Sequence, residues 1–159
     1  MSFNAYSIRP ATPDDAPRLA ALVRALERFD RLRQEPLPEA IGRIEAALAG
    51  AADGGGHSLY VAETAAGDLV GYVAVHWLPY LILLGPEGFV SELFLDAQAR
   101  GQGIGSRLLD TAVAEARARG CSRLGLLNNR QRESYERGFY ARRGWQERGD
   151  MANFVLNLE

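Results

Sequence analysis

The chain contains no lysine, and all 18 of its basic residues are arginine. A nucleoside-triphosphate loop ends in Gly-Lys-Ser or Gly-Lys-Thr, so that class of phosphate site is excluded. The single cysteine, Cys121, cannot form an internal disulfide, which fits a reducing cytosol. A formal net charge of −2 provides no field that favours nucleic acid or an anionic membrane.

Long hydrophobic runs are also missing. No apolar stretch reaches the ~18 residues of a membrane-spanning helix, and the N-terminus has no signal-peptide core. We therefore expect a cytoplasmic protein with neither a membrane nor nucleic acid as partner. The composition, 47% hydrophobic and 24% charged over 159 residues, indicates one globular domain spanning residues 1–159. No cluster with metal-ligand spacing is present, so we expect no metal.

The most informative stretch is an apolar run at residues 89–95 that is followed by a glycine-rich turn, residues 100–106. Beyond the turn, apolar residues recur at helical spacing: Ile104, Leu108, Leu109, Ala112, Val113 and Ala116. This order predicts a strand, a loop and a helix. Glycines remove the Cβ atoms that would hold another molecule away from the backbone. The first N–H groups of a helix lack intrahelical partners and carry its positive dipole end, so the turn suits a phosphate or pyrophosphate.

The glycine spacing separates the interpretations that remain. A dinucleotide-binding turn has the pattern G-x-G-x-x-G and an acidic residue about 20 positions further on. Here the glycines are 101, 103 and 105, and the next apolar run ends in two asparagines. The acyl-coenzyme-A loop, with the pattern Q/R-x-x-G-x-G/A, is matched by Arg100, Gly103 and Gly105. In this the stretch resembles the GNAT (GCN5-related) N-acetyltransferases.

The rest of the chain supports the resemblance. The predicted strands are residues 6–9, 58–63, 69–77, 89–95, 122–127, 145–148 and 152–158, and the predicted helices are residues 13–33, 38–49, 103–119 and 131–142. This is the element order of the GNAT family, and residues 139–145, Phe-Tyr-Ala-Arg-Arg-Gly-Trp, are similar to its Phe-Tyr-x-x-x-Gly-Phe signature. The resemblance implies an α/β (α+β) GNAT acyl-CoA N-acyltransferase fold, a mixed, mostly antiparallel sheet of about seven strands with about four helices.

The resemblance implies an acetyl-CoA-dependent N-acetyltransferase. It would move the acetyl group directly to a primary amine of a small molecule or a protein, in a ternary complex. In the family, main-chain groups of the central strand bind the pantetheine arm and the glycine turn binds the pyrophosphate. The corresponding candidates are Leu93, Phe94, Leu95, Arg100, Gly101, Gln102, Gly103, Ile104, Gly105 and Ser106. The family often has an asparagine and an alanine where this chain has Glu133 and Glu136. Asn129, further upstream, is carried as a candidate cofactor-binding residue.

Two residues are candidates for catalysis. Tyr140, by analogy with the tyrosine of the family's Phe-Tyr pair, would donate a proton to the leaving sulfur, because a phenol of pKa ~10 stays protonated at neutral pH. Glu92 would act as the base or anchor the substrate. Strand alternation places Glu92 with Val90 and Phe94 on the acceptor side, opposite Ser91, Leu93 and Leu95. His76 could relay protons from the neighbouring strand, whereas His57 is expected to be exposed and inert.

Two alternative functions stay open. A non-catalytic acyl-CoA sensor on the same fold would bind coenzyme A without turnover, and a dinucleotide enzyme would bind a nicotinamide cofactor.

The apolar residues Trp77, Pro79, Tyr80, Leu81 and Ile82 could form an acceptor-binding lip or a homodimer surface. The two acids Glu87 and Glu92 favour a small cationic amine as the acceptor.

Overall fold

A computed structural model describes residues 6–26, 29–52 and 54–158 of the chain. Its contacts divide the chain into two compact units, Met1–Leu126 and Leu127–Glu159. Among the described residues, no helix has both the length and the apolar character needed to cross a bilayer.

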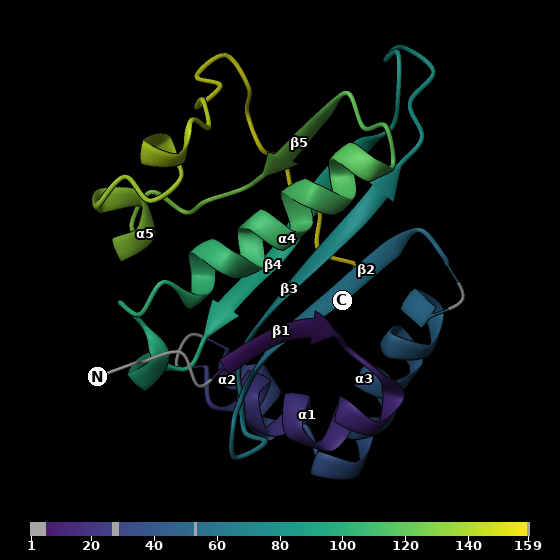
Figure 1. The fold of residues 1–159 in the computed structure, drawn as a ribbon, viewed down its shortest axis with the longest axis vertical. Helices are drawn as coiled ribbons and strands as arrows, with labels where there is room; N and C mark the ends of the chain where they lie inside the picture. Colours follow the sequence, from purple (N-terminus) through teal and green to yellow (C-terminus); the bar gives the residue numbers. More distant parts are fainter. Residues whose placement is uncertain (1–5, 27–28, 53, 159) are drawn as a thin grey trace. The chain divides into compact units, whose positions relative to one another are not determined.

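The first unit is built on one five-stranded sheet with the spatial order β1-β2-β3-β4-β5 (Figure 1). The strands are β1 (Tyr6–Pro10), β2 (His57–Thr64), β3 (Leu69–Leu78), β4 (Glu87–Leu95) and β5 (Arg123–Leu126). The first four pair antiparallel with their neighbours, and β5 runs parallel to β4. The predicted mixed, mostly antiparallel sheet is confirmed, with five strands in the described residues instead of about seven.

Helices cover both faces of this sheet. They are α1 (Ala16–Arg24), α2 (Asp30–Gln34), α3 (Leu37–Ala52) and α4 (Ile104–Ala118), with short 3₁₀ turns at Pro13–Asp15 and Ala97–Ala99. Tyr72 of β3 packs in a buried cluster with residues of α1 and α3. A Cβ on its neighbour Gly71 would instead touch Leu108 of α4. Because consecutive strand residues point to opposite faces, α4 lies on one face and α1 with α3 on the other.

Burial on the two faces explains why these segments are helical. Leu19 and Leu22 of α1 and Leu48 of α3 are buried against Val61 of β2. On the other face, α4 buries a stripe at helical spacing: Ile104, Leu108, Leu109, Ala112 and Ala116. The predicted helix 13–33 is wrong as one element, because the chain leaves α1 at Ala25 and enters α2 only at Asp30. Part of the connection, residues 27–28, lies outside the described residues.

A buried carboxylate fixes the start of α1 to the sheet. Asp15, whose side chain is fully buried, accepts hydrogen bonds from Arg9 Nη1 at 2.7 Å and from the Thr12 backbone N–H at 2.8 Å. Arg18 pairs with the same carboxylate, and both arginines also contact Glu63 of β2. The Arg9 hydrogen bond is the main reason that the pKa of Asp15 lies far below its usual value.

A β-bulge interrupts the alternation of β4. Ala74 of β3 pairs with Glu92, but the next residue, Val75, pairs with Val90, so Ser91 is an extra residue in β4. Val90 is buried, while Ser91 and Glu92 are both exposed. Ser91 hydrogen-bonds His76, so it lies on the same face as Glu92 and not with Leu93 as the alternation predicted.

The contact between β4 and β5 is short. Their parallel pairing runs only from Glu87–Arg123 to Val90–Leu126. From Glu92 to Leu95, β4 is paired with β3 on one side, and from Ser91 to Leu95 it has no β5 partner among the described residues on the other. Among the described residues, the second half of β4 therefore presents an open main-chain edge on the side of β5.

The second unit, residues 127–159, contains little regular structure. It has one short helix, α5 (Glu133–Glu136), and a 3₁₀ turn at Ala141–Arg143 that ends at Gly144. The predicted helix 131–142 is wrong as one element because Gly138, with φ +65°, follows the C-cap Arg137 and ends α5. The predicted strands 145–148 and 152–158 are absent from the described residues, and Phe154, Leu156 and Leu158 are exposed. Alternation of apolar and polar residues is compatible with a strand, but a strand forms only where a second strand is available to pair with it.

Candidate active site

The glycine turn forms a cradle free of side chains at the start of α4. Gly101 and Gly103 have φ values of +74° and +79°, a region that favours glycine, and a Cβ at either position would meet nothing within 4 Å. Helix α4 begins at Ile104, so the N–H groups of its first turn point out of the helix end. This arrangement offers several N–H donors and a positive dipole to an anion of the size of a diphosphate.

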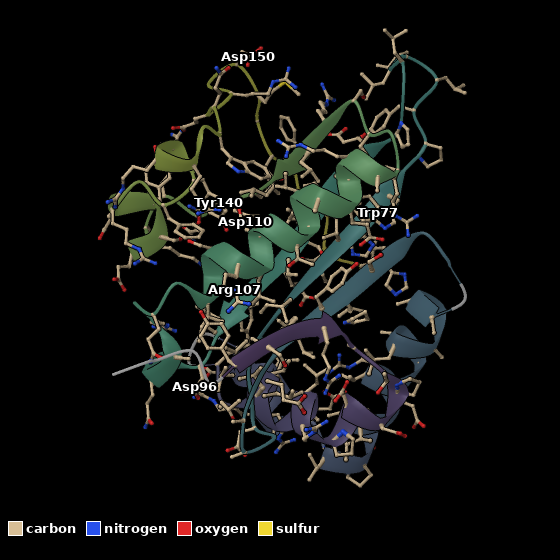
Figure 2. All side chains as sticks on the ribbon, in the orientation of Figure 1. Trp77, Asp96, Arg107, Asp110, Tyr140 and Asp150 are labelled. Carbon is tan, nitrogen blue, oxygen red and sulfur yellow. The ribbon has the colours of Figure 1, made fainter. Side chains whose placement is uncertain are left out.

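Side chains around the cradle hold it in place. Asp96 Oδ1 accepts the Gln98 N–H at 2.8 Å, and Gln102 Nε2 donates to Gln98 O at 3.0 Å. Arg107, near the start of α4, lies over the Tyr6 ring with its guanidinium carbon 4.9 Å from the ring centre (Figure 2). The turn is thus tied to the 3₁₀ turn Ala97–Ala99 before it and to β1 across the sheet.

Two polar candidates flank the same turn. Arg100 is exposed and lines a small cavity together with Leu95 and the C-terminal end of α1. Ser106, in the first turn of α4, is half-buried. Arg100 therefore lies directly before the glycine turn and Ser106 directly after it, as the motif predicts.

The candidate residues Leu93, Phe94 and Leu95 lie on the open edge of β4. Leu95 packs toward Gly71 on the face that carries α4. Phe94 points to the other face, where its ring meets Phe29 edge-on at 5.6 Å and Tyr72 at 6.0 Å. Their side chains thus serve packing on both faces, while their main-chain groups on the β5 side are available to an extended ligand.

Glu92 lies on the face of α1 and α3, opposite Leu95 as predicted, whereas the bulge moves Val90, which the alternation placed with Glu92, to the other face. Tyr72 donates a hydrogen bond to Glu92 Oε1 at 3.3 Å, and the charge of Arg43 on α3 also acts on both residues. Burial, together with Glu92, raises the pKa of Tyr72, so this phenol stays protonated. The other acid that suggested a cationic acceptor, Glu87, is paired with Arg123 at 3.1 Å. Only Glu92 therefore offers an exposed carboxylate on this face of β4.

A second polar group lies beside Glu92. His76 Nε2 is 2.9 Å from Ser91 Oγ, and the His76 ring stacks on His57 with ring centres 5.6 Å apart. His57 is half-buried and its Nε2 is 2.8 Å from Ala47 O, so the expectation that it is exposed is wrong. Strict alternation assigns Ser91 to the other face, so its place beside His76 was not predicted. Only a pattern that allows a bulge could have found it.

The remaining candidates belong to the second unit. The Tyr140 ring is half-buried between Phe139 at 4.9 Å and Trp145 at 6.0 Å, and burial raises its pKa (Figure 2). Among the described residues, its hydroxyl has no hydrogen-bond partner. Tyr135, in contrast, donates to Glu147 at 2.8 Å.

Asn129 forms a local turn in the same unit. Its Oδ1 accepts the Gln131 N–H at 2.9 Å, and its backbone carbonyl accepts the Arg132 N–H. The side-chain carbonyl thus accepts a bond within the chain, and the amide NH₂ can donate to a ligand.

Comparisons with known proteins agree with this fold. The profile of the acetyltransferase (GNAT) family matches residues 20–145. Glucosamine 6-phosphate N-acetyltransferase 1 of Oryza sativa subsp. japonica is 34% identical over 148 residues, which cover 91% of this chain and 83% of that protein.

Solved structures show the same architecture. The crystal structure of a transcriptional regulator from Bacillus halodurans C-125 is 27% identical, with a TM-score of 0.79, and covers 96% of this chain and 99% of that chain. A ribosomal-protein-alanine N-acetyltransferase from Brucella melitensis biovar Abortus 2308, at 23% identity and a TM-score of 0.73 over 97% of this chain and 100% of its own, has the same fold.

The fold and these matches define the class of protein as an acyl-CoA-dependent acyltransferase. The chain belongs to the GNAT family of acetyltransferases and is an acetyl-CoA-dependent N-acetyltransferase. The open edge of β4 and the cradle at α4 both suit this cosubstrate, since one offers main-chain partners to an amide-containing arm and the other N–H donors to a diphosphate.

Proposed function

We propose that this enzyme transfers the acetyl group of acetyl-CoA directly to the primary amine of a small acceptor in a ternary complex. The observation that carries the proposal is the open edge of β4 from Ser91 to Leu95, which leads toward the glycine cradle in the same unit. A pantetheine arm paired with this edge would hold the thioester beside Glu92, where an amine can attack it.

The proposed cosubstrate contacts follow from these elements. The main chain of Leu93, Phe94 and Leu95 pairs with the pantetheine amides. The N–H groups of residues 102–105 bind the diphosphate, with Arg100 and Ser106 beside it. Asn129, through its amide, is a further candidate contact.

Glu92 is the proposed contact for the acceptor amine. Its exposed carboxylate, on the same face as α1 and α3, can hold an ammonium group or take a proton from it. The apolar rings of Phe29 and Phe94 on this face suit a small organic amine better than a highly charged peptide. The relative from rice acts on glucosamine 6-phosphate by its name, so this amino sugar is the first acceptor to test.

Tyr140 is the proposed acid for the leaving sulfur. A thiolate that forms as the C–S bond breaks requires a proton, and a phenol with a raised pKa remains protonated at the pH of the reaction. The absence of a hydrogen-bond partner within the described residues leaves its O–H available for this transfer.

The test is a panel of amines incubated with acetyl-CoA and the purified protein, with free coenzyme A detected by a thiol-reactive dye. The panel contains glucosamine 6-phosphate, a polyamine, free amino acids and an N-terminal peptide. Release of thiol that depends on one amine, with the acetylated amine found by mass spectrometry, supports the proposal. Binding of acetyl-CoA without turnover on any amine would favour the sensor alternative.

A further inference from the structure

The acceptor face holds a polar pair that the roles of Glu92 and Tyr140 leave unused. Ser91 Oγ lies 2.9 Å from His76 Nε2, and Ser91 is exposed in the middle of β4. It occupies this position because of the β4 bulge, which directs Ser91 and Glu92 to the same face. An exposed hydroxyl backed by an imidazole can pass a proton from a bound molecule to the ring.

The surroundings of His76 keep its ring neutral. A carbonyl oxygen only accepts, so the 2.8 Å contact of His57 Nε2 with Ala47 O means that this nitrogen carries a proton. The two rings stack at an interplanar angle of 26°, so a charge on one opposes a charge on the other. Burial lowers the pKa of His76, and His57 lowers it further, against the opposing effect of Glu92.

The other charged and titratable groups on this face interact with Glu92, which in turn influences the pKa of His76. Tyr72 of β3 donates to the carboxylate, and Arg43 of α3 interacts electrostatically with both of them while pairing with Glu35. With the ring neutral at pH 7, a tautomer protonated on Nδ1 leaves the lone pair of Nε2 facing the Ser91 hydroxyl.

Glu92 alone is poorly suited to activate an amine that it also anchors. A carboxylate beside an ammonium stabilises the charged form, and so opposes the loss of the proton that the nitrogen must give up before it attacks. The proton therefore needs an acceptor next to the carboxylate that carries no negative charge.

We propose that Ser91 and His76 form the proton relay that activates the acceptor amine, with Glu92 anchoring its ammonium. This inference rests on the proposed function. Ser91 Oγ takes one proton from the ammonium while its own hydroxyl proton moves to His76 Nε2, which leaves a neutral amine, an intact hydroxyl and an imidazolium. The amine then forms the C–N bond as the C–S bond breaks, the leaving thiolate takes the proton of Tyr140, and the nitrogen loses its second proton to solvent. His76 later releases its proton to solvent, and Tyr140 regains one from solvent. Ser91 touches the substrate, and His76 acts through Ser91.

The experiment is the pH dependence of kcat/KM for glucosamine 6-phosphate, or for the panel amine that reacts fastest, in wild type, Ser91→Ala, His76→Gln and the double variant. In the wild type, kcat/KM falls at acidic pH as His76 becomes protonated. Each single variant loses about 100-fold in kcat/KM, and its acidic limb no longer reports His76. The double variant is no worse than the single ones, because the two residues act as one unit.

Two further variants serve as controls. Ser91→Thr keeps a hydroxyl at the bulge and restores most of the activity. His57→Gln removes the neighbour whose electrostatic effect lowers the pKa of His76 but leaves the relay in place, so the acidic limb moves to higher pH while the plateau is retained. The affinity for coenzyme A and the melting temperature stay the same throughout, which separates the relay from a folding effect.

The outcomes separate the two proposals. If the wild type acetylates an amine but His76→Gln keeps its rate and its acidic limb, the relay is wrong and the proposed function stands. If the wild type acetylates no amine of the panel, both are overturned.

Discussion

Ser91 and Glu92 are consecutive residues of one strand, yet their side chains lie on the same face of the sheet. The bulge in β4 places the Ser91 hydroxyl against His76 and the Glu92 carboxylate against the Tyr72 hydroxyl. Both polar groups are exposed while the flanking Val90 is buried. A bulge in a strand commonly redirects a side chain toward a site of function, and here it sets two such side chains next to one another.

Glu92→Gln tests the anchoring role. The amide keeps the shape but loses the negative charge, so we expect KM for a cationic acceptor to rise about tenfold, which corresponds to ~1.4 kcal/mol of lost binding. Steady-state kinetics with varied amine at saturating acetyl-CoA measure it. Glu87→Gln is the control, because that carboxylate is paired with Arg123. Equal KM values in wild type and Glu92→Gln would remove Glu92 from the acceptor site.

Tyr140→Phe tests the acid. Removing the hydroxyl leaves the ring packed against Phe139 and Trp145, so we expect folding and coenzyme A affinity to be unchanged and kcat to fall about tenfold or more. Since burial raises the pKa of Tyr140, wild-type activity should decline only at strongly alkaline pH. Tyr135→Phe, which loses a contact to Glu147, is the matched control and should keep its kcat.

Gly103→Ala tests the diphosphate cradle. Alanine at φ +79° costs about 1 kcal/mol of folding free energy, and its methyl group occupies the cradle. Gly67→Ala, at φ +89° in the β2–β3 hairpin, should carry the same folding cost away from the site. We expect both variants to melt at similar temperatures and only Gly103→Ala to weaken coenzyme A binding, by about tenfold in a calorimetric titration. Equal binding by the two variants would contradict the cradle.

Asp15→Asn tests the buried ion pairs that fix α1. Removing one partner of a buried pair commonly costs about 3–5 kcal/mol, and we expect a loss of this order in urea denaturation at pH 7. The bonds with Arg9 lower the pKa of Asp15 and, with those of Arg18, lower the pKa of Glu63 to about 2. Stability from a lowered carboxyl pKa is complete above the unfolded pKa of ~4 and is lost as pH falls through the folded value.

Wild type should therefore lose stability steeply below about pH 4, and Asp15→Asn should show a shallower loss over the same range. Asp14→Asn, which changes the exposed neighbouring acid, is the control and should follow the wild-type curve. A curve for Asp15→Asn that is parallel to the wild-type curve would contradict the assignment.

Substitution of Leu81 and Leu84 tests whether the protein forms the homodimer that the sequence suggests. Both side chains are fully exposed in the β3–β4 loop, with Ile82 between them. Exposed apolar side chains in a group commonly mark an interaction surface. We expect Leu81→Ser with Leu84→Ser to leave the melting temperature unchanged and to convert a dimer to a monomer in light scattering. A wild type that is already monomeric would contradict the homodimer.

The sequence predicted most of the first unit because its signals are local. The alternation of apolar and polar residues predicted β2 and β3. The glycines, followed by apolar residues at helical spacing, predicted the turn and α4. The bulge at Ser91 was not predictable by alternation, since one extra residue changes the face of every position before it. His57 was misjudged for a related reason, because three preceding glycines suggested a loop where the strand already begins.

The second unit shows where local signals end. Residues 133–142 have helical composition, but Gly138 divides them into two short turns. The tail, residues 152–158, has the alternation of a strand and no partner strand among the described residues of its own unit. Whether such a segment pairs depends on a second strand far away in sequence, which a local pattern does not contain.

The unpaired half of β4 has a practical consequence. A bare strand edge is a template for pairing with another chain, and proteins commonly guard such edges. If the pantetheine arm covers this edge in each catalytic cycle, the protein is most prone to self-association just after coenzyme A leaves. Purified protein should then be most stable in storage with an excess of coenzyme A. Removal of the coenzyme A should lower the temperature at which the solution becomes turbid through aggregation.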